Sequence, residues 1–136
     1  MGEPQGSVVD DATSSRLWSW VVLAVVVAWG CLRWRSELTP VAYADDSSVH
    51  EQMVRFALTR FQGGHLPMTS WFPYLGLGSP QFLHYQGLPA MVTGALGLAT
   101  GGDTAFRLTL YLLLSLWPVS VYCSARVFGL GAPPRC

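Results

Sequence analysis

The chain has 136 residues, of which 51% are hydrophobic and only 12% are charged, and its eight arginines balance eight acidic residues without any lysine. Soluble globular proteins carry about 25% charged residues, so an ordinary soluble domain is disfavoured. The hydrophobicity excludes a disordered chain, and the lack of a basic stripe argues against a nucleic-acid-binding protein. No charged residue occurs in 17–32, 61–102 or 108–125. These uncharged stretches predict a multi-pass protein of the cell membrane, with the lipid bilayer as its partner.

The first span is expected over residues 17–34. Residues 1–16 are polar and rich in Gly and Ser, which predicts a disordered tail. The apolar run that follows measures about 27 Å at the helical rise, close to the hydrocarbon thickness of a bilayer. Tryptophans stand near both of its ends, as in the aromatic belts of spanning helices: Trp18, Trp20, Trp29 and Trp34.

A cleavable signal peptide is the competing interpretation of this segment. Ala42-Tyr43-Ala44 resembles a signal-peptidase site. However, Arg33, Arg35 and Glu37 lie between that site and the apolar run, and a signal peptide does not place charges there. A membrane-spanning helix is therefore the preferred interpretation.

A large loop over residues 35–85 is expected to contain an amphipathic helix over 46–62. Its apolar side chains recur at helical spacing: Val49, Met53, Phe56, Ala57 and Phe61. Ser48 and Glu51 have the spacing of a capping box, and Gly63-Gly64 ends the helix. Two placements stay open for it, along the membrane surface or packed on protein.

The uncharged stretch continues into a second apolar segment. Residues 62–87 are dense in Gly, Pro and aromatics, which suits the headgroup region or a lipid-facing cleft. Residues 86–100 are short for a span and suggest a re-entrant or buried helix, but extended back to Phe82 they are long enough to cross. We expect a second transmembrane helix over 86–100. Small residues four apart would let it pack closely: Ala90 with Gly94, and Ala95 with Ala99.

The third span is expected over residues 104–128, with a kink at Pro118, and is followed by a short tail over 129–136. The fold class predicted from these segments is an all-α membrane protein with about three transmembrane helices and one amphipathic helix in the first large loop. The three cysteines show no metal-ligand spacing, and the two inside apolar segments are interpreted as small hydrophobic residues: Cys31, Cys123 and Cys136.

The residues best suited to chemistry follow the first span. Asp45 and Asp46 are adjacent carboxylates, and His50 lies one helical turn beyond Asp46. Such a group can act as a general base or bind a divalent cation. The structural alternative is that Asp46 caps the helix while Asp45 is solvated.

Four further residues are candidates for substrate binding: His65, Trp71, His84 and Tyr85. The imidazoles could contact a phosphate or a sugar hydroxyl, and the aromatic rings could stack on a sugar. The alternatives are that the histidines line an interface and that the rings anchor to headgroups. No spacing of residues predicts a metal site.

The order of these features resembles one family. After the first span come Asp-x-x-x-His at 46–50, Gly-Gly-x-Leu-Pro at 63–67, Trp-x-Pro at 71–73, Gly-Leu-Gly-Ser-Pro at 76–80, Tyr-Gln-x-Leu-Pro at 85–89 and Ser-Ala-Arg-Val-Phe-Gly-Leu at 124–130. Together they resemble the N-terminal part of bacterial multispan proteins with a GT-C-type glycosyltransferase fold, in the branch labelled 6-pyruvoyl-tetrahydropterin synthase-related.

The resemblance implies transfer of a sugar from a polyprenyl-phosphate carrier in cell-envelope glycan assembly. It implies a catalytic role for Asp46 as base, with Asp45 as the less favoured choice and His50 as partner. It also places residues 35–85 outside the cytoplasm, whereas the arginine count of that loop favours the inside. Proteins of this family continue for many more spans, so we expect activity only with a partner subunit or a C-terminal half. The alternative is a non-catalytic membrane subunit or an inactive truncated fragment.

Overall fold

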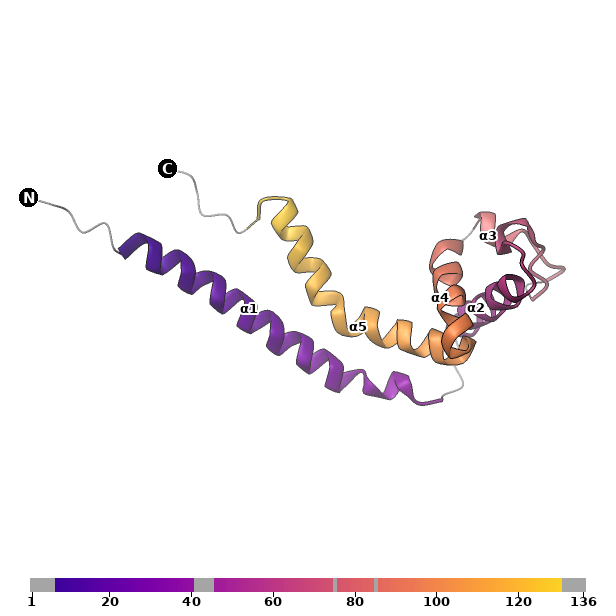
Figure 1. Cartoon of the computed structure of the whole chain (residues 1–136), viewed down its shortest axis with the longest axis horizontal. Helices are drawn as coiled ribbons and strands as arrows, with labels where there is room; N and C mark the ends of the chain where they lie inside the picture. Colours follow the sequence, from indigo (N-terminus) through magenta and orange to yellow (C-terminus); the bar gives the residue numbers. More distant parts are fainter. Residues whose placement is uncertain (1–6, 41–45, 75, 85, 131–136) are drawn as a thin grey trace, which may run out of the picture. The chain divides into compact units, whose positions relative to one another are not determined.

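The structure is a computed structural model that describes residues 7–40, 46–74, 76–84 and 86–130. These residues form only helices and connecting turns, apart from one isolated antiparallel bridge between Phe72 and Ser79. Figure 1 shows the helices in chain order: α1 Ser7–Arg33, η1 Arg35–Leu38, α2 Ser47–Gln62, η2 Pro67–Thr69, α3 Gln81–His84, α4 Gly87–Thr100 and α5 Gly102–Val127. The predicted all-α class is confirmed for the described residues.

The chain divides into two compact units. One, the helix pair, comprises residues 1–34 and 112–136, and the other, the helical module, comprises residues 35–111. Helix α5 contributes its first residues to the module and the rest to the helix pair. It stays continuous through Pro118.

Helix α1 begins at Ser7, well before the predicted start at residue 17. The disordered tail expected over 1–16 is therefore wrong for residues 7–16, and residues 1–6 lie outside the described part. Once the apolar segment has formed a helical nucleus, each added residue gains a hydrogen bond without a new nucleation cost. The helix can thus extend into a polar sequence that would not start one. The proposed cleavage site at 42–44 also lies outside the described residues.

In the helix pair, α1 and the last part of α5 run antiparallel. Gly30 lies against Ser115, where a Cβ atom on the glycine would stand 3.3 Å from the serine Cα. Further along, the rings of Trp20 and Tyr122 lie 5.3 Å apart between centroids. The small residue at position 30 lets the two backbones approach closely, as small residues do between membrane helices.

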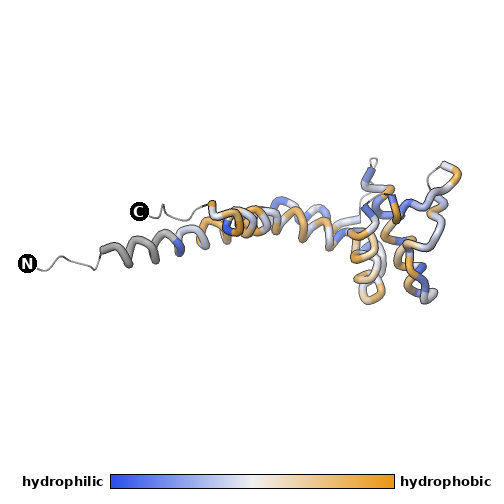
Figure 2. Tube along the Cα trace, turned by 90° about the horizontal axis from the view of Figure 1, so that it is seen from above, coloured by the Kyte–Doolittle hydropathy of each residue, from blue (hydrophilic) through white to orange (hydrophobic). Residues whose placement is uncertain are grey.

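In the described part of the chain, two helices are long and apolar enough to cross a bilayer. They are the part of α1 from Arg16 to Arg33 and the 26 residues of α5. Only 6% of each of these segments is buried inside the protein. Figure 2 shows apolar residues recurring along both. The helices predicted over 17–34 and 104–128 are therefore present with the required length.

The second predicted span, over residues 86–100, corresponds to helix α4. Helix α4 has 14 residues, which measure about 21 Å, so it is shorter than a bilayer core of about 30 Å. It does not extend back to Phe82, because that residue belongs to the separate helix α3. One side of α4 packs on α2, and the hydroxyl of Thr93 lies 3.4 Å from that of Thr109 on α5. The large side chains of its other side are exposed: Leu88, Val92, Leu96 and Leu98.

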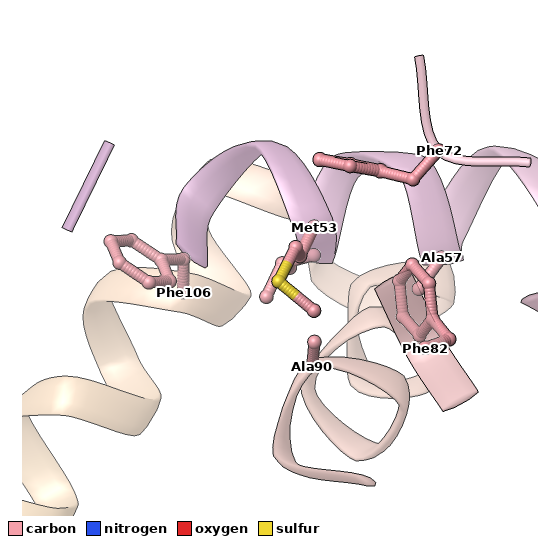
Figure 3. Close-up of a cluster of buried hydrophobic side chains, with 7 residues drawn as sticks. Met53, Ala57, Phe72, Phe82, Ala90 and Phe106 are labelled. Atoms are coloured by element: carbon pink, nitrogen blue, oxygen red, sulfur yellow. The ribbon is translucent and has the colours of Figure 1, made fainter. Parts of the chain in front are cut away.

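Helix α2 supplies the core of the helical module. Its buried residues are Met53, Val54 and Ala57, and they pack against residues from four other segments, as Figure 3 shows: Phe72, Phe82, Ala90 and Phe106. Of the two placements left open for this amphipathic helix, the one packed on protein is found. An apolar face buried in this way is not available to lie on a membrane surface.

The crossing of α2 and α4 depends on small residues. Ala90 and Gly94 are buried there, whereas Ala95 and Ala99 are exposed. A Cβ atom at Gly94 would stand 2.7 Å from the Cβ of Ala57 and 3.1 Å from the backbone of α2. Of the two predicted small-residue pairs, the first therefore forms the close contact.

Candidate functional site

Asp46 lies exposed at the start of α2, where it is the N-cap residue. Its carbonyl accepts the backbone N–H groups of Val49 at 3.0 Å and of His50 at 3.2 Å. Its carboxylate makes no capping hydrogen bond, so the interpretation of Asp46 as a side-chain cap is wrong. The reason is its helical backbone, with φ −58° and ψ −17°, whereas a capping side chain is positioned by an extended residue.

The predicted capping box is also corrected. Ser48 lies within the first turn of α2 instead of preceding it. Glu51, the second member of the box, accepts a hydrogen bond from Arg55 one turn further on, at 2.8 Å. The N-cap position is therefore two residues earlier than the box predicts, and Glu51 forms an i,i+4 ion pair on the helix.

His50 lies half-buried one turn beyond Asp46, which agrees with the predicted spacing. Asp45 lies outside the described residues, so the structure leaves the pair of carboxylates as a prediction. In the part of the chain that is described, no three His, Cys, Asp or Glu side chains gather to hold a metal ion.

The described candidate substrate-binding residues come from different segments of the helical module. His65 is exposed just after α2, and its backbone N–H donates to the carbonyl of Arg60 at 2.9 Å. His84 is exposed at the end of α3, and Trp71 is exposed in the preceding loop. Tyr85 lies outside the described residues. Among the described residues, no hydrogen bond or ring contact joins the side chains of His65, Trp71 and His84.

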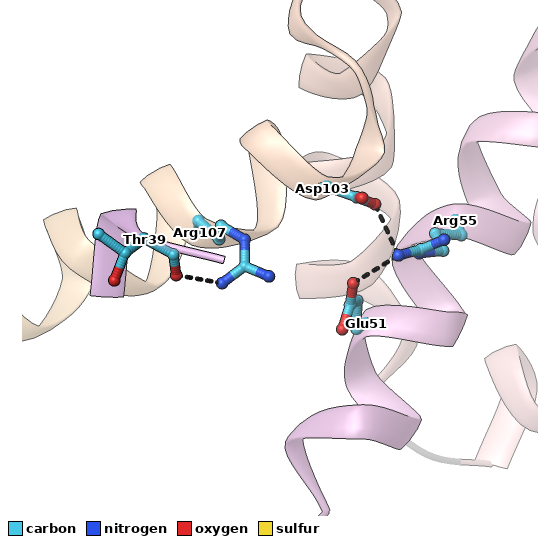
Figure 4. Close-up of polar contacts among 5 residues, drawn as sticks. All are labelled: Thr39, Glu51, Arg55, Asp103 and Arg107. Carbon is cyan, nitrogen blue, oxygen red and sulfur yellow. Dashed lines mark hydrogen bonds and ion pairs between the residues drawn. The ribbon is translucent and has the colours of Figure 1, made fainter. Parts of the chain in front are cut away.

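Sequence reasoning missed an ion-pair network around Arg55. Its guanidinium lies 2.8 Å from Glu51 and 2.9 Å from Asp103 at the start of α5, as Figure 4 shows. The hydrogen bond that Arg55 donates to Glu51 and the charges of both carboxylates raise the pKa of Arg55, against the opposing effect of partial burial. The pair with Glu51 is visible in the sequence as an i,i+4 spacing, but the pair with Asp103 has no sequence signal.

The network holds α2 to the start of α5. Arg107, also on α5, donates a hydrogen bond to the carbonyl of Thr39, at 2.6 Å. Because the Arg55 side chain is about half exposed, each of its ion pairs contributes only about 0–1 kcal/mol. The network therefore orients the helices, while the apolar contacts supply most of the stability of the module.

Cys31 and Cys123 are free thiols on α1 and α5, half-buried and exposed respectively, and Cys136 lies outside the described residues. Their positions on apolar helices agree with the interpretation as small hydrophobic residues. Comparisons of the chain with protein-family models, with curated proteins and with solved structures give no match.

Proposed function

We propose that the chain is a multi-pass component of the cell membrane whose α1 and α5 cross the bilayer. The proposal is based on the exposure of both apolar helices. Only 6% of each candidate membrane-spanning segment is buried inside the protein. Their exposed side chains include Trp18, Val25, Trp29, Leu113 and Trp117. In water each Å² of such surface costs about 25 cal/mol, whereas lipid tails or partner helices accommodate it.

Alkaline extraction of membranes from expressing cells tests the membrane proposal. We expect the chain to stay in the membrane pellet, because a spanning helix is not released when ionic contacts are broken. Mass spectrometry of the extracted chain is the companion measurement. Release into the supernatant, or a mature chain that starts after residue 44, would contradict insertion through α1.

Within this membrane component, we propose a contribution to sugar transfer from a polyprenyl-phosphate carrier. The proposal rests on the family resemblance and on Asp46, whose exposed carboxylate is not used as a helix cap. The carboxylate would take the proton of an acceptor hydroxyl while that oxygen bonds to the sugar. The bond from the sugar to the lipid phosphate breaks, and the phosphate leaves with the electron pair. The described residues supply no set of three metal ligands. The participation of a divalent cation in this reaction is therefore a separate proposal.

Asp46→Asn tests the catalytic assignment in membranes that also contain the partner subunit or C-terminal half. We expect transfer of labelled sugar from the lipid carrier to fall about 10²- to 10⁴-fold, the usual contribution of a general base. Glu51→Gln is the matched control, because it makes the same carboxylate-to-amide change on the same helix. Since Glu51 forms an ion pair with Arg55 on the same helix, its replacement should leave transfer nearly unchanged.

The second candidate function is that of a non-catalytic membrane subunit. No hydrogen bond or ring contact joins His65, Trp71 and His84 among the described residues, which favours it, because a substrate site needs convergent groups. The same assay distinguishes the two functions. Normal transfer by Asp46→Asn, together with loss of transfer when the whole chain is deleted, would establish the subunit and sink the catalytic role.

A further inference from the structure

The loop between Phe72 and Ser79 is closed and anchored. The two residues exchange backbone hydrogen bonds of 2.9 and 3.0 Å. The Phe72 side chain is fully buried, and its ring packs edge-on against Phe56 at 5.4 Å and against Phe82 at 6.2 Å between centroids. The base of the loop is thus part of the module core (Figure 3).

The outer side of this loop presents three large side chains, which we call the loop surface: Trp71, Tyr74 and Leu77. Leu77 has a relative exposure of 101%, and Trp71 and Tyr74 are each 61% exposed. In a soluble protein an exposed cluster of this kind marks a binding surface, because its contact with water is costly. Its place on an anchored loop means that the cluster is held outward by the fold.

The turn is built to keep the Trp71 ring in place. The indole Nε1–H donates a hydrogen bond to the Leu77 carbonyl at 3.3 Å. Gly78 has a φ of +85°, and a Cβ atom on it would collide with the indole nitrogen. Glycine at this position therefore lets the ring approach the turn closely with its polar N–H satisfied, as a ring entering an apolar region requires.

We propose that the loop surface inserts into the headgroup and upper acyl region of a lipid bilayer. Trp and Tyr prefer that depth, and a fully exposed Leu at the tip gains from reaching the acyl chains. No charged residue occurs from position 61 to position 102, so nothing in this stretch opposes entry as a buried charge would. A charged protein partner would find no Asp, Glu, Lys or Arg in this stretch with which to form an ion pair, so the lack of charge favours lipid over such a partner.

The chain itself brings this surface to a membrane. Helix α5 starts at Gly102 within the same module and is long and apolar enough to span. A tethered loop meets the bilayer at high effective concentration, so weak insertion becomes persistent. The proposal therefore rests on the proposed membrane insertion of α5, and it adds a third membrane contact outside both spanning helices.

Depth-dependent fluorescence quenching tests the loop surface. The full chain, with its three cysteines replaced by alanine, is placed in phosphatidylcholine–phosphatidylglycerol vesicles, and one cysteine carries the environment-sensitive dye NBD. The three labelling sites are Leu77→Cys at the tip, Gln62→Cys at the exposed polar end of α2, and Leu113→Cys within α5. The Leu113 site reports insertion of the span independently of the loop.

We expect the dye at position 77 to emit at shorter wavelength than the dye at position 62, and iodide in the water to quench it several-fold less. Lipids with a nitroxide near the top of the acyl chain should quench it more than lipids with a deep nitroxide. Iodide quenching equal to that at position 62, with position 113 protected, would overturn the loop proposal alone. Protection that grows with the protein-to-lipid ratio would assign the surface to a second copy and overturn it too. An unprotected position 113 would overturn the membrane proposal itself.

Discussion

Phe72→Ala is expected to lower the free energy of opening of the helical module by about 3–5 kcal/mol. The side chain is fully buried, and its ring contacts Phe56 and Tyr74 edge-on. Removing the ring leaves a cavity between α2 and the loop, and the surrounding aromatic side chains can fill it only in part. It also removes the anchor that joins the Phe72–Ser79 bridge to the core.

Hydrogen exchange measured by mass spectrometry on the full chain in detergent micelles is the appropriate measurement, because it reports each helix separately. Exchange in α2 and α4 should accelerate by more than about 100-fold, since each 1.4 kcal/mol corresponds to a factor of ten. Exchange in α1 should not change. Leu77→Ala is the matched control, because it shortens a fully exposed side chain of the same loop and should change stability by less than about 0.5 kcal/mol. Unchanged exchange in the Phe72 variant would show that the aromatic cluster does not hold the module together.

Gly94→Leu is expected to separate α2 from α4 and to cost about 3 kcal/mol. Even a Cβ atom at this position would stand 2.7 Å from the Cβ of Ala57 and 3.1 Å from the backbone nitrogen of Leu58. Backbone atoms cannot rotate away as a flexible side chain can, so the helices themselves must move apart. The better helix propensity of leucine, about 1 kcal/mol relative to glycine, offsets only part of this cost.

Ala95→Leu serves as the control for this prediction. Ala95 is the next residue of the same helix and is exposed, so the added side chain meets no neighbour. Exchange in α2 should be fast in the Gly94 variant and unchanged in the Ala95 variant. Equal exchange in the two variants would mean that the crossing does not depend on a small residue at position 94.

The helices themselves were largely predictable. Continuous apolar segments without charge predicted α1 and α5, and a period of about 3.6 residues predicted α2. The predicted apolar face of α2 included Met53 and Ala57, which are buried in the core, but omitted Val54, which is also buried. That omission arises because α2 is covered from more than one side, so its buried face is wider than a single stripe.

The candidate site was less predictable. The spacing from Asp46 to His50 was predicted correctly as one helical turn. Asp46 is the N-cap residue, but its side chain makes no capping hydrogen bond, and Ser48 lies inside the helix. Capping depends on the backbone angles of a single residue, and sequence patterns do not place helix ends to the exact residue. The ion pair between Arg55 and Asp103 joins residues far apart in the chain, and no local spacing encodes such a pair.

The sequence was sufficient to find the apolar segments of this protein, because hydrophobicity and its period are local properties of the chain. It could not say what covers each apolar face, since lipid and a neighbouring helix are equally apolar environments. The fold resolves that ambiguity for α2 and α4, whose faces meet across Ala57 and Gly94. The same packing holds Trp71 and Leu77 outward, a placement that depends on the distant core contacts of Phe72.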